Sequence, residues 1–310
     1  LPLVCLAARP AVATTVFCVS TESELYAAFA AGTYANDSVE VRVEAGTYWL
    51  NKDLRFDNIF GQRLYLKGGY GSFGADCNLR VWNATRTIIR AAYPSGFDVE
   101  LYSAYRVEVE NLSFYELDEV LIDVHGGYAD VKLNMVKIDS TGGLKVDTTD
   151  ANSSRVQIWN TAVLRSYEAP AVRLVLDDTD LSILYTTIYD NDRTSAEIGG
   201  LYLDTDSSTD LSISRSVFWD NGPVDLYIDD ETLSGTDVIL DEIGVGSSAV
   251  FVFMAYTEVD PRLDYDGAPL SNSPCLNAAS TTTSIPRDLL GRPRVRGSAS
   301  DIGAYEGPID

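Results

Sequence analysis

The chain has 310 residues, 45% of them hydrophobic, and its 23 basic and 46 acidic side chains give a formal net charge of −23. This charge argues against nucleic acid as a partner, because basic surfaces supply most of the affinity for it, and against a docking face for anionic lipid. It would also repel polyuronates unless a cation bridged the two. We expect the acidity to keep the protein soluble and monomeric.

The N-terminus has the composition of a targeting segment. Residues 1–6 are apolar, and Ala11-Val12-Ala13 has the small-x-small form after which signal peptidase cuts. A short ordered first strand is the alternative interpretation. No later segment approaches the roughly 20 apolar residues of a membrane span. We therefore predict that residues 1–13 are a signal-peptide remnant and that the protein is exported.

Residues 14–38 are expected to form an N-terminal cap with a helix at 20–32. Thr21 and Glu24 fit a capping box at its start, and Gly32 suits its C-terminal stop. The apolar stripe of this helix is formed by Leu25, Ala28 and Phe29. Because a solenoid exposes an open strand edge at each end, the helix would cover the first of them.

The four cysteines indicate one disulfide bond. Cys18 and Cys77 flank the cap and the first coils, so we pair them, and Cys275 is then a free, buried thiol. Cys5 falls in the signal remnant, and a bridge from it to Cys275 requires that the leader is retained. No cysteine or histidine spacing is typical of zinc or iron–sulfur sites.

A short pattern recurs through residues 39–254: two or three aliphatic residues at alternate positions, followed by a polar turn. Such a period with variable insertions is typical of a solenoid, and the alternation indicates strands. Two strand families alternate, each returning in the same direction, and parallel crossovers are overwhelmingly right-handed. We therefore predict an all-β, single-stranded right-handed parallel β-helix of about nine rungs. The apolar anchors, 20 to 30 residues apart, are Val43, Leu66, Ile89, Val109, Leu133, Ile158, Ile183, Ile213 and Ile239.

Stacking of successive rungs would align side chains in rows along the solenoid. We expect an acidic row at the ends of the second strand family, formed by His125, Asp147, Asp177, Asp204 and Asp229. An outward row beside it would contain Lys145, Val175, Tyr202 and Tyr227. A further row near the neighbouring turn would contain Leu164, Tyr189 and Trp219. Arg215 takes the rung position of Asn160 and Tyr185, so we place it in a turn.

Residues 255–310 contain six prolines, a density that does not continue a strand ladder. We predict an irregular wrap there that covers the C-terminal edge. Its strings SPCLNAAS at 273–280 and DLLGRPRVRGSASDIGAYE at 288–306 resemble the C-terminal signature of bacterial secreted β-helix proteins of the choice-of-anchor Q type, within the pectin-lyase-like superfamily. GGYGSFGADC at 68–77 is similar to proteobacterial members of that group. The resemblance implies a protein that is secreted or held at the outer surface of a Gram-negative bacterium.

The resemblance also implies an enzymatic alternative, either a polysaccharide lyase or a glycoside hydrolase. Such lyases use a basic residue beside acidic calcium ligands, and such hydrolases use clustered aspartates with Gly-His-Gly and Arg-x-Lys motifs. The single histidine, His125, stands in Val-His-Gly-Gly, and no Arg-x-Lys follows. The remaining catalytic candidates are Arg165 and Arg173 as bases and Asp177 and Asp204 as acids. Otherwise these arginines are surface charges that balance nearby aspartates.

Carboxylates stacked about 5 Å apart repel one another, so they must protonate, splay into water or bind a cation. Calcium suits several oxygen ligands in flexible geometry. We therefore consider a calcium site formed by Asp147, Asp177, Asp204 and Asp229, although no calcium-loop motif is present. The alternative is a set of solvated aspartates at strand ends, since Asp favours turns. The protein would then require no cofactor.

Aromatic rows are the other functional indication. Exposed aromatic side chains stack on sugar rings, and the carbohydrate-binding candidates are Tyr189, Tyr202, Trp219 and Tyr227. Cross-strand aromatic pairs also simply stabilise sheets. Together these observations favour a non-catalytic, adhesin-like module whose partner is an extracellular polysaccharide or a cell-surface glycan. A structural solenoid that binds another protein is a further alternative.

Overall fold

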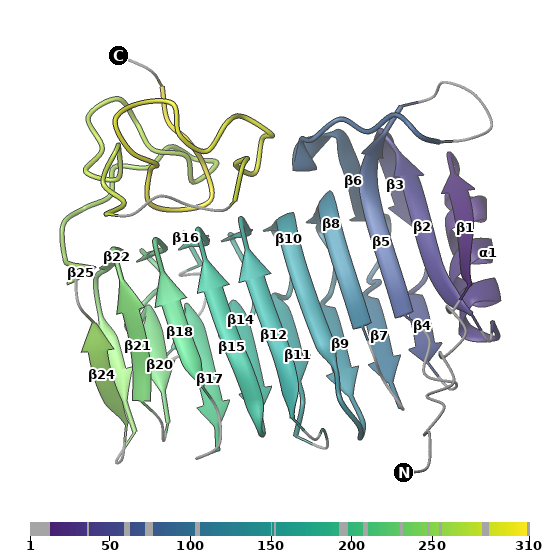
Figure 1. The fold of residues 1–310 in the computed structure, drawn as a ribbon, viewed down its shortest axis with the longest axis horizontal. Coiled ribbons are helices and arrows are strands. Elements are labelled where there is room, and N and C mark those ends of the chain that lie inside the picture. The colour runs from purple at the N-terminus through teal and green to yellow at the C-terminus, as the bar shows by residue number, and fades with distance from the viewer. Residues whose placement is uncertain are drawn as a thin grey trace, which may run out of the picture.

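The computed structural model describes residues 13–35, 37–58, 63–71, 77–102, 106–149, 151, 153–191, 198–206, 210–229, 232–246, 249–253, 256–280 and 285–308. The expected signal remnant lies almost wholly outside these residues, as does Cys5. Over the described part the chain is an all-β parallel solenoid of about eight coils with one α-helix, and the coils stack along the long axis of the molecule (Figure 1). No helix in this part is long and apolar enough to cross a membrane.

Each complete coil contributes to two parallel sheets of 17 and 8 strands. The main strands of the larger sheet are β1 (Thr14–Val19), β2 (Ser38–Glu44), β5 (Arg63–Tyr70), β8 (Arg106–Tyr115), β10 (Asp130–Asp139), β12 (Ser154–Trp159), β15 (Thr179–Leu184), β18 (Leu211–Ser214), β21 (Thr232–Thr236) and β24 (Val250–Phe253). The short strands that follow them in the same sheet are β3 (Gly46–Leu50), β6 (Thr87–Ala91), β13 (Ala162–Leu164), β16 (Thr187–Tyr189), β19 (Val217–Trp219), β22 (Val238–Leu240) and β25 (Tyr256–Thr257). The smaller sheet consists of β4 (Leu54–Asn58), β7 (Phe97–Leu101), β9 (Val120–Val124), β11 (Leu144–Asp147), β14 (Val172–Leu176), β17 (Leu201–Thr205), β20 (Leu226–Ile228) and β23 (Ile243–Val245).

The solenoid has about eight coils rather than the nine predicted. Leu66 lies in β5 and Ile89 in β6, and these two strands belong to one coil. The connection between them is long and includes the 3-10 helix Ala84–Arg86, so the two anchors were spaced in the sequence like anchors of successive coils. The right-handed winding is the prediction that parallel crossovers carry.

The core follows the period-two pattern of the sequence. Aliphatic side chains at equivalent positions of β8, β10, β12, β15 and β18 face one another in register and are at most 2% exposed. These residues are Val109, Leu133, Ile158, Ile183 and Ile213. Full burial of such a side chain contributes roughly 1.5 to 3 kcal/mol, so the repeat of these anchors supplies a continuous stabilising column.

A row of left-handed residues bends the larger sheet between its main and short strands. Arg215 occupies this row together with Asn160 and Tyr185, which confirms its predicted place in a turn. A positive φ is uncommon outside glycine, so its repetition in consecutive coils marks a fixed bend. The row consists of Asn111, Met135, Asn160, Tyr185, Arg215 and Asp237, with φ values between 48° and 61°.

The helix α1 (Glu22–Thr33) packs beside β1, β2 and β4 at the N-terminal end. Thr21 and Glu24 form the predicted capping box, and the predicted apolar stripe is buried. Gly32 lies inside the helix rather than after it. A Cβ atom there would come within 3.0 Å of a ring carbon of Phe56 and 3.2 Å of a methyl of Val39, so close packing explains this glycine. The strand β1 lies in the predicted cap, for which only a helix was expected; the short first strand kept as an alternative concerned residues 1–13.

The predicted disulfide bond between Cys18 and Cys77 is present, with its Cα atoms 5.9 Å apart. It joins β1 to the long connection of the second coil. Cys275 is a free, buried thiol, as expected.

Residues 258–308 form the irregular wrap, in which the described part contains no helix or strand. The wrap lies over the short strands of the larger sheet, alongside the solenoid rather than across its C-terminal edge at β24 and β25 (Figure 1). Backbone amides fix it there: Gly303 N donates to Arg215 O at 2.8 Å, and Ala304 N donates to Thr187 Oγ1 at 2.9 Å. The apolar outer faces of the short strands explain this position, because they need a cover of their own.

Polar residues of the 288–306 string hold the wrap together. The buried Asp288 carboxylate accepts from the backbone N–H groups of Leu290, Arg292 and Glu306, at 3.1, 2.7 and 2.9 Å. Arg294 is 1% exposed and donates to Gly303 O at 3.0 Å. A string that resembled a family signature therefore has a structural role in this fold.

Candidate functional site

The expected acidic row exists only in part. Asp147 pairs with Asp123 on one side and with Val175 on the other, and Val175 pairs with Asp204. Asp229 directly follows β20, and continuation of the β17–β20 register places it beside Asp204; its N–H donates to Leu203 O at 3.1 Å. His125 and Asp177 each lie two residues beyond this row, so their predicted alignment is wrong. The observed row is Asp57, Glu100, Asp123, Asp147, Val175, Asp204 and Asp229.

The error has a simple physical origin. A register shift of one residue would turn every side chain to the other face of the sheet, but a shift of two preserves the faces. Val172, Leu174 and Leu176 all point inward, so the hydrophobic pattern of this coil fits both registers. The motif Leu-x-Leu-Asp at 174–177 favoured the incorrect one.

The four aspartates of the considered calcium site do not form one set. Asp177 instead lies beside Asp206, and their side-chain hydrogen bond raises the pKa of Asp177. Within the described ranges, no group of three or more His, Cys, Asp or Glu side chains is placed to hold a metal ion. Calcium binding therefore stays a prediction without a defined ligand set.

Arg165 joins the solenoid to the wrap. It is 2% exposed, its Nε donates to Asp139 Oδ1 at 3.0 Å, and its Nη2 pairs with the other oxygen of that carboxylate. Its Nη1 donates to the backbone oxygen of Tyr265 in the wrap, and its guanidinium carbon lies 3.9 Å from the centre of that residue's ring. All three nitrogens are thus engaged, which favours a structural role over that of a catalytic base.

Arg173 belongs to the outward ladder of the smaller sheet. It pairs in register with Tyr202, which pairs with Tyr227, so Arg173 takes the place predicted for Val175. The rings of Tyr202 and Tyr227 stack with centroids 5.4 Å apart and planes 7° apart. The guanidinium of Arg173 lies 5.8 Å from the Tyr202 ring. The Tyr202 ring therefore contacts both Tyr227 and Arg173, and these contacts stabilise the stack of coils.

Tyr189 and Trp219 form the floor of a hollow beneath the wrap. The two residues pair in register on β16 and β19, as predicted. The hollow has a volume of about 400 Å³. Its rim comes mostly from residues far along the chain, and its polar members are Asp220, Asp260, Arg262 and Asn272. This arrangement, an aromatic floor within a polar rim, joins segments whose proximity no sequence pattern indicated.

Local contacts fix the shape of this rim. The backbone N–H of Arg262 donates to Asp260 Oδ1 at 2.8 Å, and Arg262 Nη1 donates to Asn272 O at 3.3 Å. Burial, and after it the nearby carboxylates, raise the pKa of Tyr189. The phenol therefore stays protonated at neutral pH and is available as a hydrogen-bond donor.

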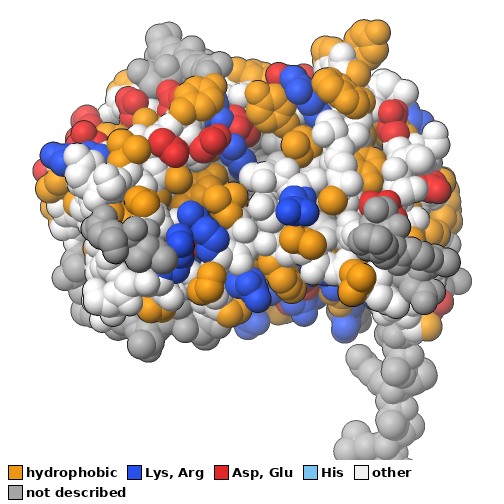
Figure 2. Space-filling model, turned by 90° about the horizontal axis from the view of Figure 1, so that it is seen from above, with side chains coloured by type: hydrophobic (Ala, Val, Ile, Leu, Met, Phe, Trp, Pro, Cys, Tyr) orange, Lys and Arg blue, Asp and Glu red, His pale blue; other side chains and the backbone are white. Residues whose placement is uncertain are grey.

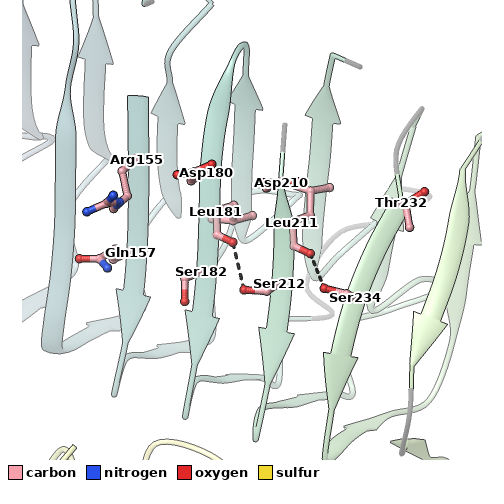
Figure 3. Close-up of a pocket in the computed structure, with 10 residues that line it drawn as sticks. All are labelled: Arg155, Gln157, Asp180, Leu181, Ser182, Asp210, Leu211, Ser212, Thr232 and Ser234. Atoms are coloured by element: carbon pink, nitrogen blue, oxygen red, sulfur yellow. Dashed lines mark hydrogen bonds between the residues drawn. The ribbon is translucent and has the colours of Figure 1, made fainter. Parts of the chain in front are cut away.

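A second hollow, a groove of about 500 Å³, crosses the outer face of β12, β15, β18 and β21 (Figure 3). Its first row contains Arg155, Asp180, Asp210 and Thr232, and its second row contains Gln157, Ser182, Ser212 and Ser234. Ser212 Oγ donates to Leu181 O at 3.3 Å, and Ser234 Oγ donates to Leu211 O at 2.9 Å. Each hydroxyl thus ties one coil to the one before it.

Asp180 and Asp210 are the acids that the sequence interpretation missed. They precede Leu181 and Leu211, which pair in register, and Leu181 N donates to Asp210 O at 2.8 Å. Both aspartates line the one groove, and their strands are neighbours with a backbone spacing of about 4.8 Å. The repeated string Asp-Leu-Ser-Ile at 180–183 and 210–213 carried this signal in the sequence.

Comparison of the chain with protein-family models, with curated proteins and with solved structures finds no match in any of the three. The parallel solenoid is compatible with pectin-lyase-like proteins. The resemblance of residues 273–306 to the choice-of-anchor Q group is supported by no family match and stays a prediction.

Proposed function

We propose that this protein is an extracellular glycan-binding module and that the hollow of Tyr189 and Trp219 holds a sugar chain. The observation that carries the proposal is the aromatic pair in register beneath a polar rim. A pyranose ring has an apolar face that stacks on aromatic rings and a hydroxyl edge that hydrogen-bonds to carboxylates, amides and guanidinium groups. The hollow offers all four kinds of group.

Charge narrows the ligand class. The net charge of −23 and the rim acids Asp220 and Asp260 repel polyanions. The ligand is accordingly a neutral polysaccharide or a neutral cell-surface glycan. The disulfide bond of Cys18 and Cys77 supports action in an oxidising compartment, such as the exterior of a Gram-negative cell.

A glycan array followed by titration calorimetry tests this proposal. Trp219→Ala should weaken binding about tenfold, because a stacked aromatic ring contributes on the order of 1 kcal/mol and this one also shapes the hollow. Trp49→Ala is the matched control, since Trp49 is 46% exposed on β3 at the other end of the solenoid. Binding that survives Trp219→Ala but is lost with Tyr227→Ala would move the site to the outward ladder. No binding to any neutral glycan would overturn the proposal.

A second candidate function, glycoside hydrolysis, is favoured by Asp180 and Asp210. Retaining hydrolases hold two carboxyl groups about 5 Å apart across the scissile bond, the spacing that adjacent strands provide. Release of reducing ends from neutral polysaccharides, lost in Asp180→Asn and in Asp210→Asn, would support it. Absence of release by the unaltered protein would exclude it. A parallel assay for unsaturated product with polyuronates, with and without a calcium chelator, addresses the lyase alternative.

A further inference from the structure

A pocket between the solenoid and the wrap belongs to neither hollow described above. It has a volume of about 270 Å³ and is lined by Trp82, Glu110, Asn134, Met135, Asn160, Ile285, Pro286 and Arg287. Three separated parts of the chain build it: the long connection of the second coil, the bend region of β8, β10 and β12, and the wrap. The view onto the wrap shows Lys and Arg side chains across the middle of this face of an otherwise acidic protein (Figure 2).

The polar side of the pocket is fixed in advance by a chain of hydrogen bonds. Glu110 and Asn134 pair in register, and Asn134 Nδ2 donates to Glu110 Oε1 at 2.9 Å. Asn160 Nδ2 donates to Asn134 Oδ1 at 3.3 Å, and Arg294 donates to Asn160 Oδ1. Side chains held in this way lose little freedom when a ligand binds.

The carboxylate of Glu110 sets which ligand groups fit. Arg80 Nη1 donates to Glu110 Oε2 at 2.6 Å, so the charge of this carboxylate is balanced. An ionised carboxylate offers about four acceptor positions, and these two bonds leave capacity for ligand O–H donors. Because Arg80 and Arg287 both lie close, a ligand ammonium group would meet net positive charge. Hydroxyl groups suit this site better than a cation.

The remaining walls are apolar. Trp82 is 36% exposed, and the guanidinium of Arg80 lies 4.2 Å from the ring centre on one face, which leaves the indole's other surface for the pocket. Met135, Ile285 and Pro286 complete the apolar lining. A ligand that satisfies both sides has a hydroxyl-bearing edge and an apolar face within a volume near that of one sugar ring.

We propose that this pocket binds a single neutral pyranose, as a free monosaccharide or as the terminal unit of a glycan. Trp82 stacks on the sugar ring, Glu110 accepts its hydroxyl protons, and Asn134 and Arg287 donate to its oxygens. The site is independent of the Tyr189–Trp219 hollow, which holds the interior of a chain. Because the pocket joins the wrap to the solenoid, an occupied pocket ties these two parts together.

Saturation-transfer NMR with a panel of methyl glycosides of the common neutral hexoses, pentoses, deoxyhexoses and N-acetylhexosamines tests the pocket. At least one should bind the unaltered protein and raise its unfolding temperature, since a ligand that binds only the folded state stabilises it. Trp82→Ala should weaken that binding at least tenfold. Trp49→Ala, whose ring also lies under an arginine (Arg90, 4.6 Å), should leave it unchanged. Far-ultraviolet circular dichroism confirms that each variant folds.

Two further comparisons separate this site from the proposed function. Trp219→Ala should retain the methyl glycoside, and Arg287→Ala should weaken it while sparing polysaccharide binding in the hollow. A trisaccharide that ends in the same sugar binds as tightly as the glycoside if the pocket takes chain ends, and far more weakly if it takes free sugars. The inference is overturned if no glycoside of the panel binds, or if Trp82→Ala and Trp49→Ala bind equally.

Discussion

The guanidinium carbon of Arg294 lies 4.2 Å from the ring centre of Tyr185, so a residue of the wrap sits on a bend residue of the solenoid. Arg294 also donates to Ala304 O at 3.2 Å and lies 3.4 Å from Glu306 Oε1. The fully buried Arg294 therefore links two segments of the wrap and also joins the wrap to the row of left-handed residues that bends the larger sheet. Arg294 also donates to Asn160, and Asn160 lines the pocket that contains Trp82.

We predict that Arg294→Met loosens the wrap without unwinding the coils. The substitution leaves the buried oxygens of Gly303, Ala304 and Asn160 without their donor, which costs on the order of 3 kcal/mol in total, and the methionine recovers part of the packing. Chemical denaturation should show the loss, and limited proteolysis should cut the wrap before the solenoid. Arg86→Met, at an exposed position of the 3-10 helix, should change neither measurement. Equal stability of the two variants would contradict the role of Arg294 in holding the wrap against the solenoid.

Stability should depend on pH through Glu306. Burial raises the pKa of this carboxyl from 4.5 to about 7, although Arg294 opposes the shift. The folded protein therefore holds a proton that the unfolded chain releases between these values, so the free energy of unfolding falls as pH rises from 4.5 to 7. At about 1.4 kcal/mol per pH unit, the fall amounts to roughly 3 kcal/mol at most. Urea titrations of the unaltered protein and of Glu306→Gln should differ in this slope, and parallel curves would refute the assignment.

Reduction of the Cys18–Cys77 bond should destabilise the N-terminal coils. The cysteines are 59 residues apart, and opening a loop of this size costs roughly 4 kcal/mol in the chain-entropy treatment. Thermal unfolding with and without reductant measures the effect. A protein with both Cys18→Ser and Cys77→Ser should match the reduced form and respond no further to reductant.

Cys275 should resist alkylation in the folded protein. Burial raises the pKa of its thiol to about 12, so almost no reactive thiolate forms at neutral pH. Mass spectrometry after iodoacetamide should find Cys275 unmodified under native conditions and modified in denaturant. Rapid labelling of the native protein would show that the wrap opens.

Much of the architecture could be predicted from local pattern. The alternating aliphatic residues identified the strands, and Thr21 with Glu24 identified the helix start, because capping and side-chain alternation depend on neighbouring residues. The register of Tyr189 with Trp219 was also accessible, since both follow short apolar strings of equal length. The registers of Val175 and Asp177 could not be predicted, because inward-facing positions repeat every two residues. The hydrophobic pattern therefore fits equally well when the strand is shifted by two residues.

The sequence by itself determined that this chain winds into a parallel solenoid, since period-two hydrophobicity in a recurring unit leaves few other ways to bury its apolar faces. Only the tertiary structure decided where the wrap lies, and with it the Tyr189–Trp219 hollow and the Trp82 pocket. Both cavities join residues about 40 to 200 positions apart through contacts of Arg294, Asp288 and Arg165. Such contacts depend on the summed geometry of several coils, which no local pattern encodes.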